Sequence, residues 1–557
     1  MMLTIFQNLK MAIHQKMLCN KPQAITTTII LFIIILPNYN YAHPNYSLNL
    51  PKREDNDNNG GSSSLLATLP YNFLFATASS AYQYEGAYLV DGKGLNNWDT
   101  FTHKSGGILD NSNGDVATDH YHRYLEDVEL MVDLGLNSYR FSISWARILP
   151  KGRYGEINLA GISFYNKLID TLLAKGIQPF VTLSHFDIPQ ELEDRYNGFL
   201  STELQKDFEY YADVCFRYFG DRVKYWVTFN EPNVNIIQGY RNGKYPPNRC
   251  SGLFGNCSEG DSEKEPFIAA HNLILAHAAA VNTYRTKYQE KQGGKIGIVL
   301  NAIWFEPISN SEFDKFAAER AQSFYTNWFL DPIMFGEYPA EMRKILGKNL
   351  PRFSKNEQRI LNKALDFIGI NHYSSFYAQD CMFTSCKTGP GVTWTEGVYL
   401  RTPYRKGIPI GEPTAMDWLY IHPQGMEKTI TYMKDRYNNT PMIVTENGYV
   451  QESNSNSSVT ELLNDSKRVE YMASYLDSLL RSIKKGADVR GYFAWSLLDN
   501  FEWLYGYTKR FGLYHVDYNT LKRSPKSSVV WYKNFIAKHK RQQILKQTGT
   551  EQALQSS

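Results

Sequence analysis

Two glutamates, Glu231 and Glu446, have the setting expected of carboxyl groups that work as a pair. Glu231 stands in Thr-Phe-Asn-Glu-Pro (228–232) and Glu446 in Val-Thr-Glu-Asn-Gly (444–448), and each follows a short apolar run with the character of a buried strand. Two such carboxyls can cleave a glycosidic bond. One gives a proton to the leaving oxygen, and the other, ionised, meets the positive charge that grows at the anomeric carbon.

Eight apolar runs predict the strands that must position these residues. Most are continuous rather than alternating, which is typical of parallel strands buried on both faces. The runs cover 71–77, 137–144, 177–184, 223–229, 296–304, 366–371, 441–445 and 490–496. Helical patterning is clear at 121–134, 162–174 and 204–219, and glycines follow the first two of these near the expected C-caps.

Eight strand–helix units favour an α/β fold of one closed (β/α)₈ TIM barrel, with its active site at the carboxyl ends of the strands. Long loops at 91–118, 235–265, 377–420 and 450–466 would crown that face. An open doubly wound sheet is the alternative, and the absence of a Gly-rich phosphate loop after the first strand weakens it.

Polar and aromatic residues follow nearly every predicted strand. They are Gln83 and Glu85, Arg140 and Trp145, His185 and Asp187, Asn230 and Glu231, Asn371, His372 and Tyr373, Glu446 and Asn447, and Trp495, Asp499, Asn500, Glu502 and Trp503. Each residue alone is explained as well by core packing or a salt bridge. Because they meet at one end of a barrel, they predict a site for a ligand rich in hydroxyl groups.

The ends of the chain differ from its middle. Residues 25–37 form an apolar stretch after three lysines, shorter than the roughly 20 residues of a membrane span. We therefore predict a signal peptide over 1–42, with a retained signal anchor as the alternative. Polar residues 43–66 predict a disordered leader, 67–536 the barrel domain, and 537–557 a polar tail.

Composition narrows the class of partner. Apolar residues make up 43% of the 557 residues and charged residues 21%, an ordinary globular balance. The net charge of +3 provides no electrostatic footprint for nucleic acid or for an anionic membrane. We expect a small-molecule ligand and no membrane association after signal cleavage, and the sequence leaves the oligomeric state open.

Six cysteines fit an exported protein. Cys250 with Cys257, and Cys381 with Cys386, each close a short loop, so either pair fits a disulfide in an oxidising compartment. A zinc site is the rival interpretation, but no companion ligand pair accompanies them. Cys215 lies in a helical pattern and is predicted to be a buried thiol. Sequons for N-glycosylation stand at Asn45, Asn438, Asn456 and Asn464; a further one, at Asn256, has Cys257 in its middle position.

Five collinear motifs resemble those of glycoside hydrolase family 1. They are Thr-Phe-Asn-Glu-Pro, Val-Thr-Glu-Asn-Gly, Ala-Tyr-Gln-Tyr-Glu-Gly-Ala (81–87), Tyr-Arg-Phe-Ser-Ile-Ser-Trp (139–145) and Trp-Ser-Leu-Leu-Asp-Asn-Phe-Glu-Trp (495–503). The resemblance runs from about residue 70 to about 536. It implies a barrel of retaining β-glycosidases without a metal or organic cofactor, and the exported, cysteine-containing character is similar to plant members.

The resemblance implies a role for each matching residue. Glu231 would be the proton donor and base, and Glu446 the nucleophile, with carboxyls about 5–5.5 Å apart. Arg140, Asn371 and Tyr373 would be charge and hydrogen-bond partners of Glu446. The substrate-binding positions would be Gln83, His185, Asn230, Trp495, Glu502, Trp503 and Phe511 for the sugar, and Trp418 for the aglycone. Burial and the charge of Glu446 would raise the pKa of Glu231.

Two positions distinguish this chain within the resemblance. The family's myrosinase branch has Gln at the acid/base position, whereas Glu231 preserves ordinary acid catalysis. Ser-His-Phe-Asp (184–187) replaces the more common Phe-His-Trp-Asp, so Phe186 changes the outer pocket. Val234, Gln238 and Tyr245 are further aglycone candidates.

An aromatic wall favours a flat aromatic aglycone. The chain resembles the plant branch that cleaves monolignol glucosides such as coniferin and syringin, which would place a secreted enzyme in lignification, at the cell wall or apoplast or, alternatively, in the vacuole. The alternatives are a β-glucosidase for cyanogenic, flavonoid or oligosaccharide glucosides, a transglucosidase that uses the same intermediate, and a sugar-binding protein without catalysis.

Overall fold

A computed structural model of the chain describes residues 69–361, 365–453 and 457–547. The predicted signal peptide and leader, the sequons at Asn45 and Asn456, and the end of the tail lie outside these ranges. All eight predicted strands are present. They are β1 (Leu74–Ala78), β2 (Ser138–Ser142), β3 (Gln178–Ser184), β4 (Tyr225–Asn230), β5 (Lys295–Asn301), β7 (Phe367–Asn371), β14 (Met442–Asn447) and β16 (Val489–Trp495).

The eight strands close into one barrel, and every neighbouring pair is parallel. The ring closes where Leu74 of β1 pairs with Gly491 of β16. Four of the strands, β1, β2, β7 and β14, are buried along their whole length, and the other four are buried except at one or two residues, which explains why most read as apolar runs. Inside, the ring of Phe180 packs on those of Phe367 and Phe493, with centroids 5.4 and 4.9 Å away, so the barrel has a filled core.

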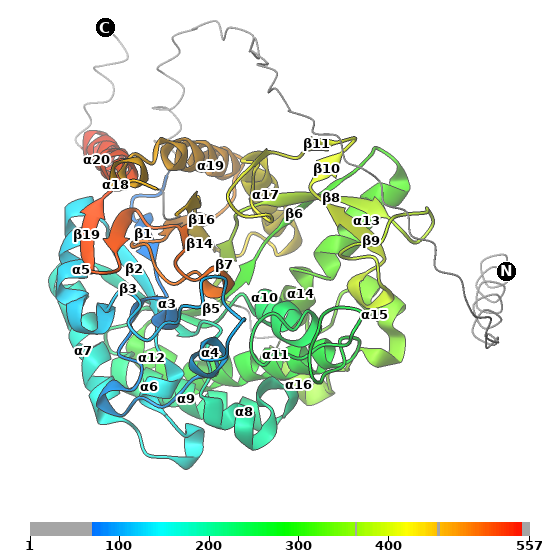
Figure 1. The fold of residues 1–557 in the computed structure, drawn as a ribbon, viewed down its shortest axis with the longest axis horizontal. Helices are drawn as coiled ribbons and strands as arrows, with labels where there is room; N and C mark the ends of the chain where they lie inside the picture. The colour runs from blue at the N-terminus through cyan, green and yellow to red at the C-terminus, as the bar shows by residue number, and fades with distance from the viewer. Residues whose placement is uncertain (1–68, 362–364, 454–456, 548–557) are drawn as a thin grey trace, which may run out of the picture. The chain divides into compact units, whose positions relative to one another are not determined.

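Helices surround the barrel (Figure 1). The three that the sequence predicts are α5 (His120–Leu134), α7 (Leu159–Ala174) and α9 (Glu203–Phe219). The others that cover the strands are α11 (Glu265–Thr283), α14 (Asn327–Phe335), α17 (Gln424–Arg436), α19 (Ser466–Lys484) and α20 (Ser527–Gln547). Gly135 caps α5 in the left-handed region, φ +78°, as its position after the helical pattern indicates.

The end of the domain and the content of the long loops differ from the sequence prediction. Helix α20 continues to Gln547 and buries His539, so the ordered chain does not end at 536 and the expected tail begins as helix. The predicted loops also contain regular elements. Residues 91–118 hold α4 (Asn97–Thr102), 235–265 hold the end of α10 (Pro232–Ile236) and the π-helical turn η4 (Ile237–Arg241), and 377–420 hold most of β8 (Ser375–Asp380) and all of β9 (Tyr399–Thr402).

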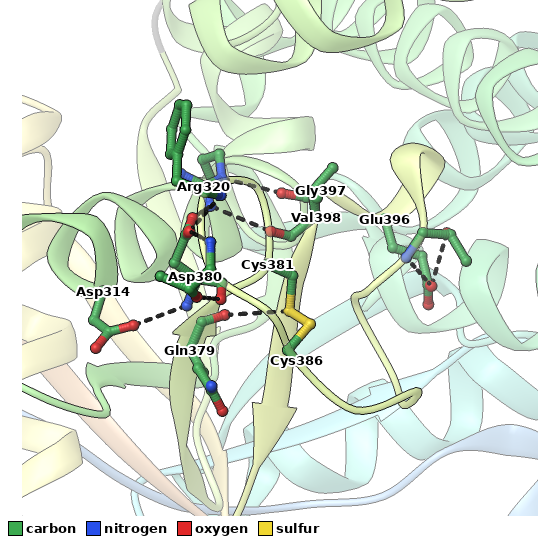
Figure 2. The surroundings of a disulfide bond; sticks show 12 residues. Asp314, Arg320, Gln379, Asp380, Cys381, Cys386, Glu396, Gly397 and Val398 are labelled. Atoms are coloured by element: carbon green, nitrogen blue, oxygen red, sulfur yellow. Dashed lines mark hydrogen bonds and ion pairs between the residues drawn. A yellow bond between two sulfur atoms is a disulfide. The ribbon is translucent and has the colours of Figure 1, made fainter. Parts of the chain in front are cut away.

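Both cysteine pairs form disulfides, Cys250–Cys257 and Cys381–Cys386, and Cys215 is a buried free thiol. Figure 2 shows the second disulfide beside Asp380, at the end of β8. The Arg320 guanidinium donates to the Asp380 carboxylate at 2.6 Å and to the carbonyl oxygens of Gly397 and Val398. The disulfide and Arg320 therefore hold the two ends of the segment 387–398, several residues of which line the cavity described below.

Candidate active site

Glu231 and Glu446 lie at the same end of the barrel, one directly after β4 and the other near the end of β14. Both side chains line one cavity of about 670 Å³. Glu231 joins β4 to α10 with φ +42°, a left-handed conformation that costs a residue with a Cβ about 1–3 kcal/mol. Pro232 then occupies the first position of α10, where its fixed φ suits a helix start. The tight turn brings the Glu231 carboxyl to the cavity wall.

Glu446 is held by two strong donors. Arg140 Nη1 donates to its Oε1 at 2.5 Å, and the Tyr373 hydroxyl donates to its Oε2 at 2.8 Å. Arg140 is fully buried on β2, and its Nη2 also donates to Asn230 Oδ1 at 2.7 Å. The expected partnership of Arg140 and Tyr373 with Glu446 is therefore present, and it gives this carboxyl a fixed orientation and a counter-charge.

Glu231 is held by amides instead of by a cation. Asn371 Nδ2 donates to its Oε1 at 2.8 Å, and Asn301 Nδ2 donates to the same oxygen at 3.0 Å. Asn371 Nδ2 also donates to Asn230 Oδ1 at 3.0 Å, and its Oδ1 accepts from the Thr445 hydroxyl at 2.7 Å. As expected, a hydrogen bond from Asn371 also acts to lower the pKa of Glu446, so this amide serves both carboxyls. The sequence reasoning missed Asn301. Asn301 is the last residue of β5. The fifth predicted strand was the one after which the motifs indicated no polar site residue, although Asn301 lies within it.

The two carboxyls differ in charge. Burial raises the pKa of Glu231 to about 8, and the charge of Glu446 acts in the same direction. Burial also raises the pKa of Glu446, but the charge and hydrogen bond of Arg140 oppose that effect. At neutral pH this arrangement favours a protonated Glu231 beside an ionised Glu446, which is the division between an acid and a nucleophile.

Asn301 gives a specific prediction about pH. Its hydrogen bond stabilises the ionised form of Glu231, so Asn301→Ala should raise the pKa of Glu231 further. We expect the basic limb of the kcat/KM profile to move to higher pH by roughly one unit, the scale of one hydrogen bond to a charged group. The matched control is Tyr325→Phe, which removes only the hydroxyl that donates to Asn301 Oδ1 at 2.8 Å. A limb that moves equally in both variants would contradict this role.

The expected sugar-binding residues line the same cavity, with one exception. Those present on its wall are His185, Asn230, Trp495, Glu502, Trp503 and Phe511. The His185 ring stacks between Trp495 and Trp503, with centroids 5.8 and 6.1 Å away. Such faces suit the C–H surface of a pyranose ring.

Two polar atoms on this wall have no hydrogen-bond partner among the described residues, His185 Nδ1 and Glu502 Oε2. His185 Nε2 meets the Asn230 amide nitrogen at 3.0 Å, so Nε2 accepts and Nδ1 carries the proton. Burial lowers the pKa of His185 well below its ordinary value, which keeps the ring neutral. The wall thus offers the His185 N–H as a donor and the Glu502 carboxyl oxygen as a further partner to a hydroxylated ligand, since buried polar atoms are rarely left unpaired.

Gln83 does not line the cavity. It is fully buried, and its Nε2 donates to Asn500 Oδ1 and to the Phe501 carbonyl oxygen, at 3.0 and 2.9 Å. Its Oε1 accepts from the Ser80 hydroxyl at 2.7 Å. In this structure Gln83 supports the loop before Glu502 and does not reach the ligand cavity.

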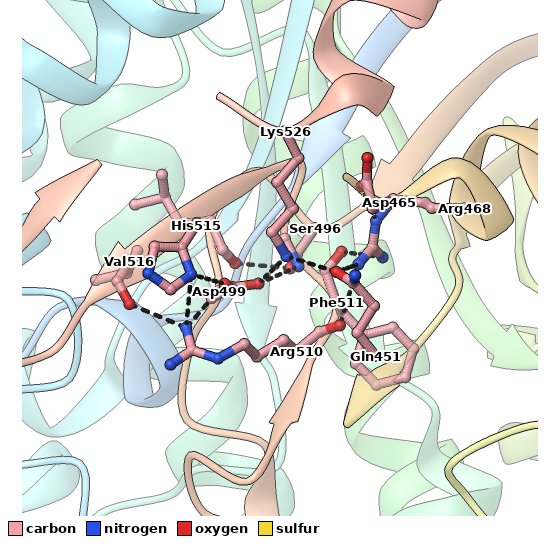
Figure 3. A network of polar contacts seen from close by, with 12 residues as sticks. Gln451, Asp465, Arg468, Ser496, Asp499, Arg510, Phe511, His515, Val516 and Lys526 are labelled. Carbon is pink, nitrogen blue, oxygen red and sulfur yellow. Dashed lines mark hydrogen bonds and ion pairs between the residues drawn. The ribbon is translucent and has the colours of Figure 1, made fainter. Parts of the chain in front are cut away.

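A buried ionic network around Asp499 supports the same loop (Figure 3). Asp499 accepts from Lys526 Nζ at 2.8 Å and from Arg510 Nη1 at 2.9 Å. Burial alone would raise the pKa of Asp499, but the Lys526 charge and further contacts with His515 and Arg510 hold it well below its ordinary value. Removing one partner of such a buried pair leaves an uncompensated charge, so the network fixes the backbone that carries Glu502.

The outer wall of the cavity is aromatic. Trp418 is half-buried and packs edge-on against Tyr373, 5.9 Å between centroids. Phe186 packs against Trp503 at 5.1 Å and against Tyr245 at 5.8 Å. Val234 and Gln238 also line this part. The arrangement fits a flat apolar group attached to the sugar.

Two further observations concern the described residues alone. No group of three or more His, Cys, Asp or Glu side chains in them is placed to hold a metal ion. Within the same ranges, no helix is both long and apolar enough to cross a membrane.

Comparison with known proteins places the chain among glycosidases. The model of glycosyl hydrolase family 1 matches residues 65–541. Beta-glucosidase 47 of Arabidopsis thaliana is 59% identical over 85% of this chain and 85% of its own length. The coniferin beta-glucosidase of Pinus contorta is 54% identical over 84% of this chain and 91% of its own. The structure of a mutant rice beta-glucosidase in a covalent complex with Glc is 50% identical, with a TM-score of 0.80, over 84% of this chain and 98% of that one.

Proposed function

The chain belongs to glycosyl hydrolase family 1, and we propose that it is a retaining β-glucosidase in which Glu231 is the acid/base and Glu446 the nucleophile. The observation that carries the assignment is the asymmetry of the two carboxyls. Arg140 and Tyr373 hold Glu446, whereas Glu231 has only amide partners and a pKa raised to about 8. One group is prepared to be an anion and the other to hold a proton.

The reaction then proceeds in two displacements. Glu446 attacks the anomeric carbon while Glu231 protonates the leaving oxygen, which yields a covalent glucosyl ester on Glu446 and a free aglycone alcohol. Esterification removes the charge on Glu446, so the pKa of Glu231 falls. Glu231 then takes a proton from water, which attacks the ester and releases glucose. Carboxyl chemistry alone carries both steps.

A covalent intermediate also permits transfer to an alcohol. The same glucosyl ester would give a new glucoside if an acceptor alcohol, bound against Trp418 and Phe186, reached it before water. Hydrolysis is the simpler proposal because water needs no acceptor site. Analysis of products with and without added alcohols separates the two activities.

We propose aryl and phenylpropanoid β-glucosides, including coniferin and syringin, as the substrates. The aromatic wall of Phe186, Tyr245 and Trp418 supports this proposal, as does the similarity to the coniferin beta-glucosidase. A kinetic panel of purified protein tests it: we expect kcat/KM for coniferin and syringin to exceed that for cellobiose by roughly tenfold or more, the effect of about 1.4 kcal/mol of aglycone binding. Equal or faster turnover of cellobiose or of a cyanogenic glucoside would contradict it.

We also propose that the protein is exported and glycosylated. The apolar segment 25–37 and the two disulfides support export. Asn438 and Asn464 are exposed, as glycan acceptors must be. Sequencing of the mature amino terminus checks the cleavage site, with His43 expected first; a mature chain that retains residues 25–37 would contradict cleavage.

A further inference from the structure

The outer half of the cavity carries cations that the proposed reaction does not use. Arg241, Lys244 and Arg401 all line it. Arg241 ends the π-helical turn η4 that follows Glu231 and α10, and Arg401 lies on β9. The two arginines therefore come from segments far apart in the sequence and line one cavity.

Arg241 is a buried cation without an ion-pair partner. Arg241 is 4% exposed, and no carboxylate of the described residues lies within ion-pair distance of its guanidinium. Its Nη2 donates to the Thr395 carbonyl oxygen at 3.0 Å, and its Nε is buried with no partner among the described residues. Burial lowers the pKa of Arg241, and the nearby Glu396 charge partly opposes this. The guanidinium also lies near the Phe267 and Trp328 rings, 5.7 and 5.9 Å from their centroids, but these rings leave the Nε–H without an acceptor. A buried donor without an acceptor is costly unless a ligand binds it.

Arg401 is also unpaired. Within the described part of the chain its side chain has no ion pair or hydrogen bond, and its guanidinium lies over the Phe376 ring, 5.2 Å from the centroid. Its charge acts on Tyr325, which also feels the charge of Glu231. Tyr325 is linked to Glu231 through Asn301. Arg401, Tyr325 and Glu231 all line the same cavity.

Arg241 and Arg401 line the same cavity as the buried Tyr399. Burial raises the pKa of Tyr399, and the charges of both arginines oppose that effect. Tyr399 directly follows the segment 387–398. Arg320, Asp380 and the Cys381–Cys386 disulfide hold that segment in place (Figure 2). The positive wall is thus built on an anchored part of the structure.

We infer that this wall is a subsite for a carboxylate on the aglycone, so that β-glucosides of phenolic acids form a second substrate class beside the neutral phenylpropanoid glucosides. The planar forks of Arg241 and Arg401 match a carboxylate, and the aromatic residues Phe186, Tyr245 and Trp418 of the same cavity match the phenyl ring. Two acids, Glu396 and Asp417, also line the cavity, and they disfavour a dianion more than a single carboxylate. The inference rests on the proposed function for its glucoside chemistry.

The test compares ferulic acid 4-O-β-glucoside with its methyl ester, which shares the leaving phenol but has no charge. At neutral pH we expect kcat/KM for the acid to exceed that for the ester by roughly tenfold, as one charged hydrogen-bonded contact supplies. Arg401→Gln should bring the ratio close to one, and Arg401→Lys should retain part of it. An acid that reacts no faster than the ester, or a ratio unchanged in Arg401→Gln, would overturn the inference.

Arg405→Gln is the matched control, because Arg405 is an exposed arginine of the neighbouring β10 (Tyr404–Arg405) that does not line the cavity. Its acid-to-ester ratio should equal that of the unmodified chain. Calorimetric binding of the acid and ester to the Glu446→Gly variant repeats the comparison without turnover. An acid-to-ester ratio of one, with continued hydrolysis of 4-nitrophenyl β-glucoside, would contradict this inference alone. Absence of hydrolysis of every aryl β-glucoside would contradict the proposed function.

Discussion

Glu446→Gly should lower kcat for aryl β-glucoside hydrolysis by roughly 10⁵-fold or more, the scale of loss when a covalent nucleophile is removed. The expected loss is this large because Glu446 is the cavity carboxylate that Arg140 and Tyr373 hold. Arg140 and Tyr373 direct both Glu446 oxygens within the cavity, and Glu231 is protonated at neutral pH. Discontinuous assays of glucose release with 4-nitrophenyl β-glucoside measure the residual rate.

Azide sharpens this test. In Glu446→Gly the lost side chain leaves room for a small anion, and Arg140 remains to attract it. We expect added azide to restore turnover and to give α-glucosyl azide, since a single displacement inverts the anomeric carbon. A slow 2-deoxy-2-fluoro glucoside should add one sugar mass to the peptide that contains Glu446 in the unmodified chain. Full hydrolytic activity in Glu446→Gly, or labelling of another residue, would refute the assignment.

The barrel could be predicted from the sequence because its strands are buried on both faces. A run such as Val-Lys-Tyr-Trp-Val before Glu231 is apolar apart from Lys224, and the parallel arrangement places every strand's carboxyl end on one rim. The polar residues that follow the strands therefore had to meet. Glu231, Glu446, Arg140 and Tyr373 were found in this way, and the structure brings them together.

What the sequence could not show depends on side-chain direction and on distant contacts. Gln83 belongs to a site motif, but its amide turns toward Asn500 and away from the cavity. Asn301 has no motif, and its bond to Glu231 follows from the end point of β5. The polar residues after 536 conceal a helix because, among residues 537–545, α20 buries only His539. The wall with Arg401 depends on Arg320, which is distant in sequence from the segment that it holds.

Glu231→Gln should slow each substrate according to its leaving group. Coniferin needs a proton on its departing phenol, so its kcat/KM should fall by roughly 10²–10⁴-fold, the usual contribution of general acid catalysis. The 2,4-dinitrophenyl glucoside leaves as a stable anion, so its kcat/KM should change little. Its kcat should still fall, because water loses its base in the second step. Azide should restore that kcat and give β-glucosyl azide, the opposite anomer to that from Glu446→Gly.

The pH profile gives the same variant a second readout. Glu231 acts as an acid only when protonated, and its pKa is raised to about 8, so kcat/KM for coniferin should be maintained below that pH and fall as pH rises through about 8. The acid limb belongs to ionisation of Glu446, whose pKa burial also raises. Burial raises the pKa of Glu502 to about 8 as well. The basic limb of the profile can therefore contain ionisation of both Glu231 and Glu502. Glu231→Gln separates the contributions: the basic limb should disappear with the 2,4-dinitrophenyl glucoside, and a limb that persists unchanged would assign it to Glu502.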